Sequence, residues 1–177
     1  MRYLILSCSL NPTSRSRILA RMVYAHLFTR PGGAEFVDLQ DYSLPITDSG
    51  ACYSHPDVVE LTPKVRAAKG IIVATAIYNY SVNAATKNLL ELTGKAWDGK
   101  VVGFICAAGG HGSYMSVMPF ANSLMLDYHC HIIPRFVYAA PAHIDQSTFG
   151  DDALNRRIEE LAAATQRVTE ALFAGGV

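Results

Sequence analysis

Short hydrophobic runs alternate along this chain with longer segments in which hydrophobic residues recur every three or four positions. The runs predict strands, and the continuous ones predict strands covered on both faces. Three runs are continuous, at residues 3–8, 71–77 and 101–107, and two weaker ones lie at 34–38 and 132–138. The segments with a helical period lie between and after them, at residues 14–29, 57–68, 83–93, 113–126 and 151–173.

This order of elements predicts the fold class. Strands that alternate with helices form a parallel sheet, because each helix carries the chain back to the edge where the next strand begins. With five strands, we expect a doubly wound, flavodoxin-like α/β fold with the strand order 2-1-3-4-5 and helices on both faces of the sheet. No change in composition marks a boundary, so we expect a single domain over residues 1–177.

Composition and charge narrow the range of partners. Half of the residues are hydrophobic, and 15 Lys and Arg balance 15 Asp and Glu. We therefore expect no nucleic-acid partner, which would require an excess of basic residues. No run approaches the roughly 20 apolar residues that cross a bilayer, and the scattered cysteines suit a reducing compartment, so we expect a cytoplasmic protein without a membrane partner. Zero net charge combined with much apolar surface favours a homodimer or homotetramer.

Candidate chemistry is concentrated in the loops that follow the strands, where ligands of open α/β sheets bind. The first loop leads into a helix that should begin near Ser14. A helix N-terminus presents unpaired N–H groups and favours negative charge, so this loop is a candidate phosphate site. Its side-chain donors are Ser9, Asn11, Ser14 and Ser16. An N-cap followed by ordinary turn residues would give the same sequence.

Two later loops offer groups suited to a flat heterocycle. The loop after the third strand contains Ile77, Tyr78, Asn79 and Tyr80, in which aromatic faces lie next to polar atoms. After the fourth strand come Gly109, Gly110, His111 and Gly112. Glycines allow the backbone to approach a ligand closely, although a glycine cluster alone would also suit a tight turn.

A phosphatase is the competing interpretation of the first loop. Low-molecular-weight tyrosine phosphatases place a nucleophilic Cys after their first strand and an Arg that closes the loop around the phosphoryl group. Here Cys8 and Arg15 are separated by one residue too many for that ring. Cys8 also lies at the end of a predicted strand, where burial would keep its thiol protonated. The sequence therefore favours a bound phosphate over a reacting one.

Taken together, the three loops resemble the NADPH-dependent FMN reductase family over about residues 1–140. This resemblance implies a flavodoxin-like fold, bound FMN and a dimer or tetramer. It implies that Ser9, Asn11, Ser14 and Ser16 belong to the FMN phosphate loop, that Ile77, Tyr78 and Asn79 follow the ribityl chain and the isoalloxazine, and that Gly109, Gly110 and His111 lie at the ring edge. The family often has Arg or Lys where this chain has Asn11, and Pro where it has Ala76. Arg15 is the candidate replacement for the missing cation.

The resemblance implies an FMN-dependent NAD(P)H oxidoreductase that passes a hydride from the nicotinamide to FMN and on to a small acceptor. Flavin, quinone, azo compounds and metal oxyanions are all candidate acceptors. The cofactor carries the chemistry, so we expect no catalytic side chain beyond a substrate contact from His111, and no metal. The alternative is a flavin-binding electron carrier or redox sensor that does not turn over a nicotinamide. Such carriers are typically strongly acidic, so the balanced charge of this chain favours the reductase.

Overall fold

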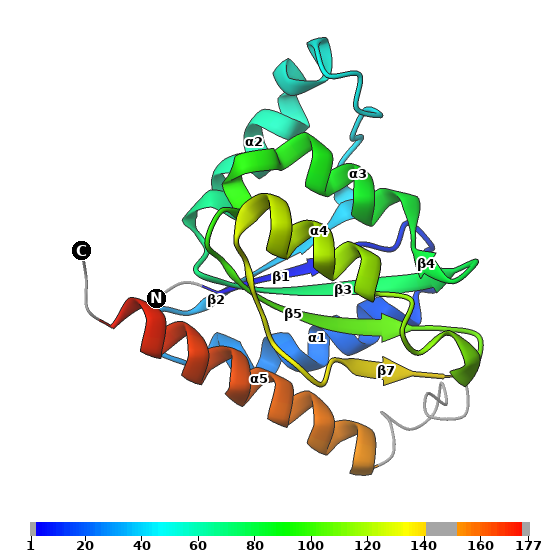
Figure 1. Ribbon diagram of the computed structural model, residues 1–177, viewed down its shortest axis with the longest axis vertical. Coiled ribbons are helices and arrows are strands. Elements are labelled where there is room, and N and C mark those ends of the chain that lie inside the picture. Colours follow the sequence, from blue (N-terminus) through cyan, green and yellow to red (C-terminus); the bar gives the residue numbers. More distant parts are fainter. Residues whose placement is uncertain (1–2, 141–151, 175–177) are drawn as a thin grey trace.

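A mainly parallel sheet separates two layers of helices in the computed structural model, which describes residues 3–140 and 152–174 (Figure 1). The strands are β1 (Tyr3–Ser7), β2 (Ala34–Asp38), β3 (Gly70–Tyr78), β4 (Ser81–Val82), β5 (Val101–Ala107), β6 (His131–Ile132) and β7 (Val137–Ala139). The helices are α1 (Arg15–Phe28), α2 (Pro56–Ala67), α3 (Ala84–Thr93), α4 (Met118–Tyr128) and α5 (Asp152–Phe173). Short 3₁₀ turns lie at Leu39–Asp41, Ala51–Ser54, Gly94–Trp97 and His111–Ser113.

The sheet order β2-β1-β3-β5-β6 confirms the predicted doubly wound topology. All of these pairings are parallel. The predicted fifth strand, 132–138, is split into two pieces that both pair with β5. Pro134 and the left-handed Arg135 (φ 60°) lie between the pieces. Proline has no N–H to donate to the ladder, so the pairing is interrupted there.

Two helix layers bury the sheet, as Figure 1 shows, with α2, α3 and α4 on one face and α1 and α5 on the other. Trp97 and Phe104 belong to the core under the first layer, and Ile5 and Leu19 to the core under the second. The periodicity predicts one buried stripe along α5, made of Leu154, Ile158, Leu161, Thr165, Val168 and Leu172. Its first four residues are buried as predicted, whereas Leu172, near the end of the helix, is 47% exposed. Residue 151, where this helix was predicted to begin, lies outside the described residues.

One predicted helix boundary was wrong. The segment 113–126 was expected to be helical throughout, whereas α4 begins at Met118. The preceding residues form a glycine loop and a 3₁₀ turn, and Pro119 lies in the first turn of the helix, where its missing N–H costs nothing. None of the helices among the described residues combines the length and the apolar character that crossing a membrane requires.

Candidate functional site

The loops after β1, β3 and β5 surround one cavity of about 680 Å³. The predicted site residues that line it are Ser9, Asn11, Ser14, Arg15, Ser16, Ile77, Tyr78, Asn79 and Gly109. Thr13, Ile18, Ala76, Ala107 and Ala108 line it as well and were not predicted. The other predicted site residues, Tyr80, Gly110 and His111, follow lining residues closely in the sequence but do not line the cavity themselves. The alanines have no chemical signature, so only their place at the strand ends could have indicated them.

Buried hydroxyls lie at the N-terminus of α1. Ser14 is the N-cap, and its Oγ accepts a hydrogen bond from the Arg17 amide. The Oγ atoms of Ser14 and Ser16 are 2.8 Å apart. Ser9, Ser14 and Ser16 are each at most 6% exposed. The first turn of α1 contains no acidic residue, so nothing in it offsets the positive end of the helix dipole. This end of the cavity therefore suits an anion.

The Asn11 side chain is already engaged within the loop. Its Oδ1 accepts hydrogen bonds from the amide and the hydroxyl of Thr13, both at 3.0 Å. This contact closes an Asx turn, which shapes the loop just before the helix. The cation at the cavity is instead Arg15, the first residue of α1, which is exposed and lines the cavity.

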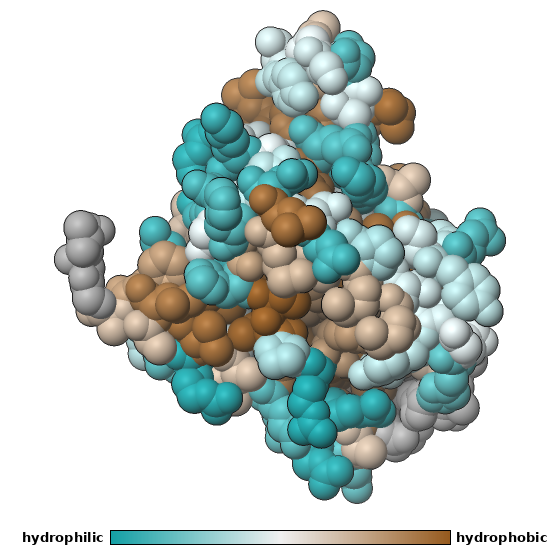
Figure 2. All heavy atoms as spheres, in the orientation of Figure 1, coloured by the Kyte–Doolittle hydropathy of each residue, from teal (hydrophilic) through white to brown (hydrophobic). Residues whose placement is uncertain are grey.

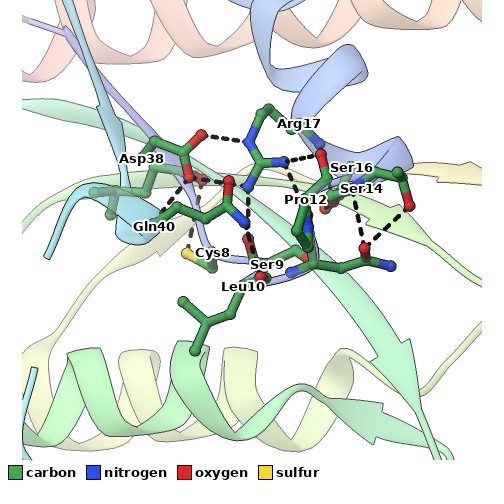
Figure 3. Close-up of polar contacts among 12 residues, drawn as sticks. Cys8, Ser9, Leu10, Pro12, Ser14, Ser16, Arg17, Asp38 and Gln40 are labelled. Carbon is green, nitrogen blue, oxygen red and sulfur yellow. Dashed lines mark hydrogen bonds and ion pairs between the residues drawn. The ribbon is translucent and has the colours of Figure 1, made fainter. Parts of the chain in front are cut away.

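The Arg17 side chain contacts the backbone of the same loop (Figure 3). Its guanidinium donates to the carbonyls of Ser9 (2.9 Å), Asn11 (2.9 Å) and Pro12 (3.1 Å) and forms an ion pair with Asp38. Both charged side chains are nearly buried, at 11% and 9% exposed. Neither of these two side chains lines the cavity. Arg17 thus fixes the backbone of the first loop through three of its carbonyl groups.

Gln40 completes this support, because its side-chain amide donates to the Leu10 carbonyl at 2.8 Å. Asp38 and Gln40 come from the end of β2 and the turn that follows it. Sequence reasoning missed Arg17, Asp38 and Gln40. No local spacing could have indicated the Arg17–Asp38 and Gln40–Leu10 contacts, since they join residues that are 21 and 30 positions apart.

The second loop is a tight hairpin. β3 and β4 pair antiparallel, with Tyr78 opposite Ser81, so that Asn79 and Tyr80 form a two-residue turn. Both turn residues have positive φ, 50° and 60°, as type I′ hairpin turns require. Asn83 then caps α3 by accepting a hydrogen bond from the Thr86 amide, and its Nδ2 donates to the Cys8 carbonyl at 3.2 Å. The loops after β1 and β3 are thus joined directly.

The third loop is held by Tyr138 on β7. The buried phenol donates to the Gly110 carbonyl at 2.6 Å and lies 2.5 Å from the Ser113 hydroxyl. Its ring contacts His111, with the ring centroids 6.4 Å apart. A Cβ built on Gly109 or Gly110 would meet no atom within 4 Å, so the backbone of this loop borders open space. Tyr138 was not predicted as a site residue.

Replacing Tyr138 by Phe keeps the ring and removes both hydrogen bonds. We expect the free energy of unfolding to fall by about 1 kcal/mol and amide exchange to accelerate across residues 109–114. Hydrogen–deuterium exchange followed by mass spectrometry measures the second effect. Tyr24→Phe on α1 is the matched control. Equal exchange in this loop for Tyr138→Phe and the wild-type protein would contradict a role for the phenol in holding it.

Cys8 cannot serve as a nucleophile. It is fully buried, and burial raises the pKa of its thiol to about 12. The thiolate, which is the reactive form, is therefore scarce at neutral pH. Cys8 also does not line the cavity. The phosphatase interpretation fails on both grounds.

A model of one protein family matches residues 1–144, and its description is NADPH-dependent FMN reductase. The match covers most of the chain and includes all three loops. The chain belongs to this family. Its fold, the match and the relatives identify a flavin-dependent oxidoreductase that uses FMN and NAD(P)H.

Curated relatives of this FMN reductase family member are distant but cover most of the chain. An NAD(P)H-dependent FAD/FMN reductase from Geobacillus thermodenitrificans (strain NG80-2) is 25% identical over 146 residues, which are 81% of this chain and 79% of that protein. An NADPH:quinone oxidoreductase from Arabidopsis thaliana is 28% identical over 144 residues, 76% of this chain and 74% of that protein. The fold is shared with the flavoenzyme NAD(P)H:(acceptor) oxidoreductase FerB from Paracoccus denitrificans, whose structure superposes with a TM-score of 0.78 at 18% identity. The superposition covers 96% of this chain and 97% of the FerB chain.

The donor set of the cavity fits FMN. A phosphate suits the anion site formed by the buried serines and the helix N-terminus, with Arg15 as a cation beside it. A flat ring suits the tyrosine and backbone surfaces of the second loop and the open space beside Gly109. The volume of about 680 Å³ falls within the range of ordinary ligand pockets.

Proposed function

We propose that this protein binds FMN in the cavity between the three loops and uses NAD(P)H to reduce a small acceptor there. The observation that carries the proposal is that loops from three neighbouring strands of the sheet, one of them ending in a helix N-terminus, line a single cavity. Flavin, quinone, azo compounds and metal oxyanions are the acceptor classes we consider. The activities for which the Geobacillus and Arabidopsis relatives are named support flavin and quinone.

In this proposal the first loop holds the phosphate of FMN. Ser9, Ser14 and Ser16 donate hydroxyl hydrogen bonds, and Arg15 supplies the cation that other family members have at the position of Asn11. The Asn11 side-chain amide donates to the phosphate while its oxygen remains bound to Thr13. Charge-assisted contacts of this kind are about twice as strong as neutral ones, so Arg15 contributes most among these side chains.

The other two loops orient the ring system. Ile77, Tyr78 and Asn79 border one side, with Tyr80 outside them at the rim, and Gly109, Gly110 and His111 border the other. When bound, FMN supplies the two-electron chemistry between NAD(P)H and the acceptor. The chain's own residues bind and orient, and none needs to act as an acid, base or nucleophile. His111 is exposed at the rim, where a substrate contact is open to it.

The visible spectrum of the purified protein tests the proposal, followed by mass analysis of whatever is released on denaturation. We expect a yellow protein, or a colourless one that turns yellow with added FMN. Anaerobic mixing with NADPH or NADH should then bleach the flavin within seconds. A protein that takes up no FMN contradicts the proposal. A flavin that stays oxidised would instead favour the electron carrier or redox sensor.

We further propose that one domain carries this activity and that the protein works in the cytoplasm as a homodimer or homotetramer. Figure 2 shows hydrophobic surface over α4 and between α4 and α5. On α4, Leu126 is 78% exposed and Met125 38%. With zero net charge, little long-range repulsion opposes self-association. Light scattering coupled to size exclusion measures the assembly, and a monomer at micromolar concentration would contradict it.

A further inference from the structure

Tyr80 has an unusual combination of backbone and environment. It occupies the second position of the β3–β4 turn with φ 60°, a left-handed conformation that favours glycine. Its side chain is nevertheless 72% exposed. The free energy gained by burying so little of the side chain therefore does not offset the conformational strain that this aromatic residue imposes on the turn. A glycine at this position would suit the fold better than a tyrosine does.

Positive φ by itself does not mark a functional residue in this protein. Ser49, His129 and Arg135 also have it, and His129 is simply the left-handed C-cap of α4. Tyr80 differs from them in its location, because it directly follows Tyr78 and Asn79, which line the cavity. Its neighbour in the turn, Asn79, is a residue type that tolerates this conformation, whereas a tyrosine does not.

The Tyr80 side chain extends toward the glycine loop. A Cβ built on Gly112 would lie 3.6 Å from the Tyr80 hydroxyl oxygen. The ring thus extends from the loop after β3 to the loop after β5, both of which contribute residues to the cavity wall. Its place is at the rim, since it is not itself a lining residue.

We infer that Tyr80 is a specificity-determining residue that stacks on flat aromatic acceptors, such as quinones, as they enter the site. This inference rests on the proposed function. An exposed ring at the rim offers a face to a planar molecule and leaves a small inorganic acceptor unaffected. In the reaction, NAD(P)H and one solvent proton are consumed as the quinone becomes a hydroquinone, and Tyr80 takes no part in the transfer itself.

Two variants of Tyr80 test the inference. Tyr80→Gly should raise the KM for 2-methyl-1,4-naphthoquinone about fivefold and leave the KM for hexacyanoferrate(III) and the affinity for FMN unchanged. Tyr80→Phe keeps the ring and should retain the wild-type quinone KM. Tyr53→Ala removes an exposed tyrosine elsewhere, at the Ala51–Ser54 turn, and serves as the control.

Two readouts are independent of turnover. The dissociation constant of 2-naphthol, a flat analogue that accepts no electrons, should rise about fivefold in Tyr80→Gly when measured by calorimetry on the FMN-loaded protein. The melting temperature of FMN-free Tyr80→Gly should rise by about 2–4 °C, because glycine relieves the turn.

The inference is overturned if the quinone KM is unchanged in Tyr80→Gly or if the KM for hexacyanoferrate(III) rises by the same factor. It is also overturned if Tyr80→Gly lowers the affinity for FMN. The last outcome would make Tyr80 a cofactor contact. These failures are distinct from failure of the proposed function, which a wild-type protein without FMN uptake would reveal and which would remove this inference as well.

Discussion

Ser14→Asp should lower the affinity for FMN by about 100-fold or more and leave the fold intact. Ser14 is buried at the N-terminus of α1, in contact with Ser16. A carboxylate there would lie beside the proposed phosphate, and two like charges about 4 Å apart repel by roughly 4 kcal/mol near a protein surface. Aspartate is as good an N-cap as serine, and its charge suits the helix dipole. The helix should therefore remain capped.

Fluorescence titration of the FMN-free protein with FMN measures the effect. Ser14→Asn is the matched control, because asparagine has the shape and capping ability of aspartate without its charge. Riboflavin provides a second comparison, since it lacks the phosphate and should bind the Asp and Asn variants equally. If Ser14→Asp binds FMN within threefold of wild type, the phosphate lies elsewhere.

Arg17→Met should lower the free energy of unfolding by about 3–5 kcal/mol, because it leaves the Asp38 carboxylate buried without its cation. It also removes the donors for the carbonyls of Ser9, Asn11 and Pro12. A loss of this size is a large part of the 5–15 kcal/mol typical of a folded domain. Urea denaturation measures it. Lys87→Met, which breaks the exposed ion pair with Glu91, is the control and should cost less than about 1 kcal/mol.

The double variant Arg17→Met/Asp38→Leu separates two effects of losing Arg17, the unpaired charge of Asp38 and the loss of contacts to the first loop. Removing both charges should restore much of the stability, since buried ion pairs are often replaceable by apolar groups. FMN affinity should remain below that of the wild-type protein in both variants, because the carbonyls of Ser9, Asn11 and Pro12 lose the donors that fix the first loop. Arg17→Met costing no more than Lys87→Met would contradict the structural role of the ion pair. Wild-type FMN affinity in the double variant would contradict its role in shaping the loop.

Periodicity predicted the strands of the parallel sheet, the helices and their order, because a doubly covered parallel strand requires a continuous hydrophobic run. Residues 71–77, for example, fall within β3, of which every residue but Tyr78 is buried. The position of the cavity followed from the same reasoning, since parallel strands place their carboxyl ends at one edge. The start of α4 and the split between β6 and β7 depend on prolines within segments that otherwise looked regular. Periodicity did not predict the two-residue β4, which lies in a segment assigned to a loop.

The supports of the site were beyond sequence reasoning. The Tyr138 hydroxyl contacts Gly110 across 28 positions, and Asn83 contacts Cys8 across 75. Such contacts depend on how the sheet brings strand ends together, and no periodicity records them. Asn11 is a different case, because its contact with Thr13 is local. The sequence placed Asn11 in the first loop as a phosphate ligand, whereas its side-chain oxygen forms a turn with Thr13.

The assembly of the cavity from three separate strand ends makes folding and cofactor supply interdependent. An unfolded chain retains none of this arrangement, so FMN would bind the native state alone. At a hundredfold excess over its dissociation constant, such a ligand adds about 2.7 kcal/mol to stability. In a cell with scarce flavin, a larger fraction of this protein would be unfolded and open to proteases, and its abundance would track riboflavin metabolism without any dedicated regulator.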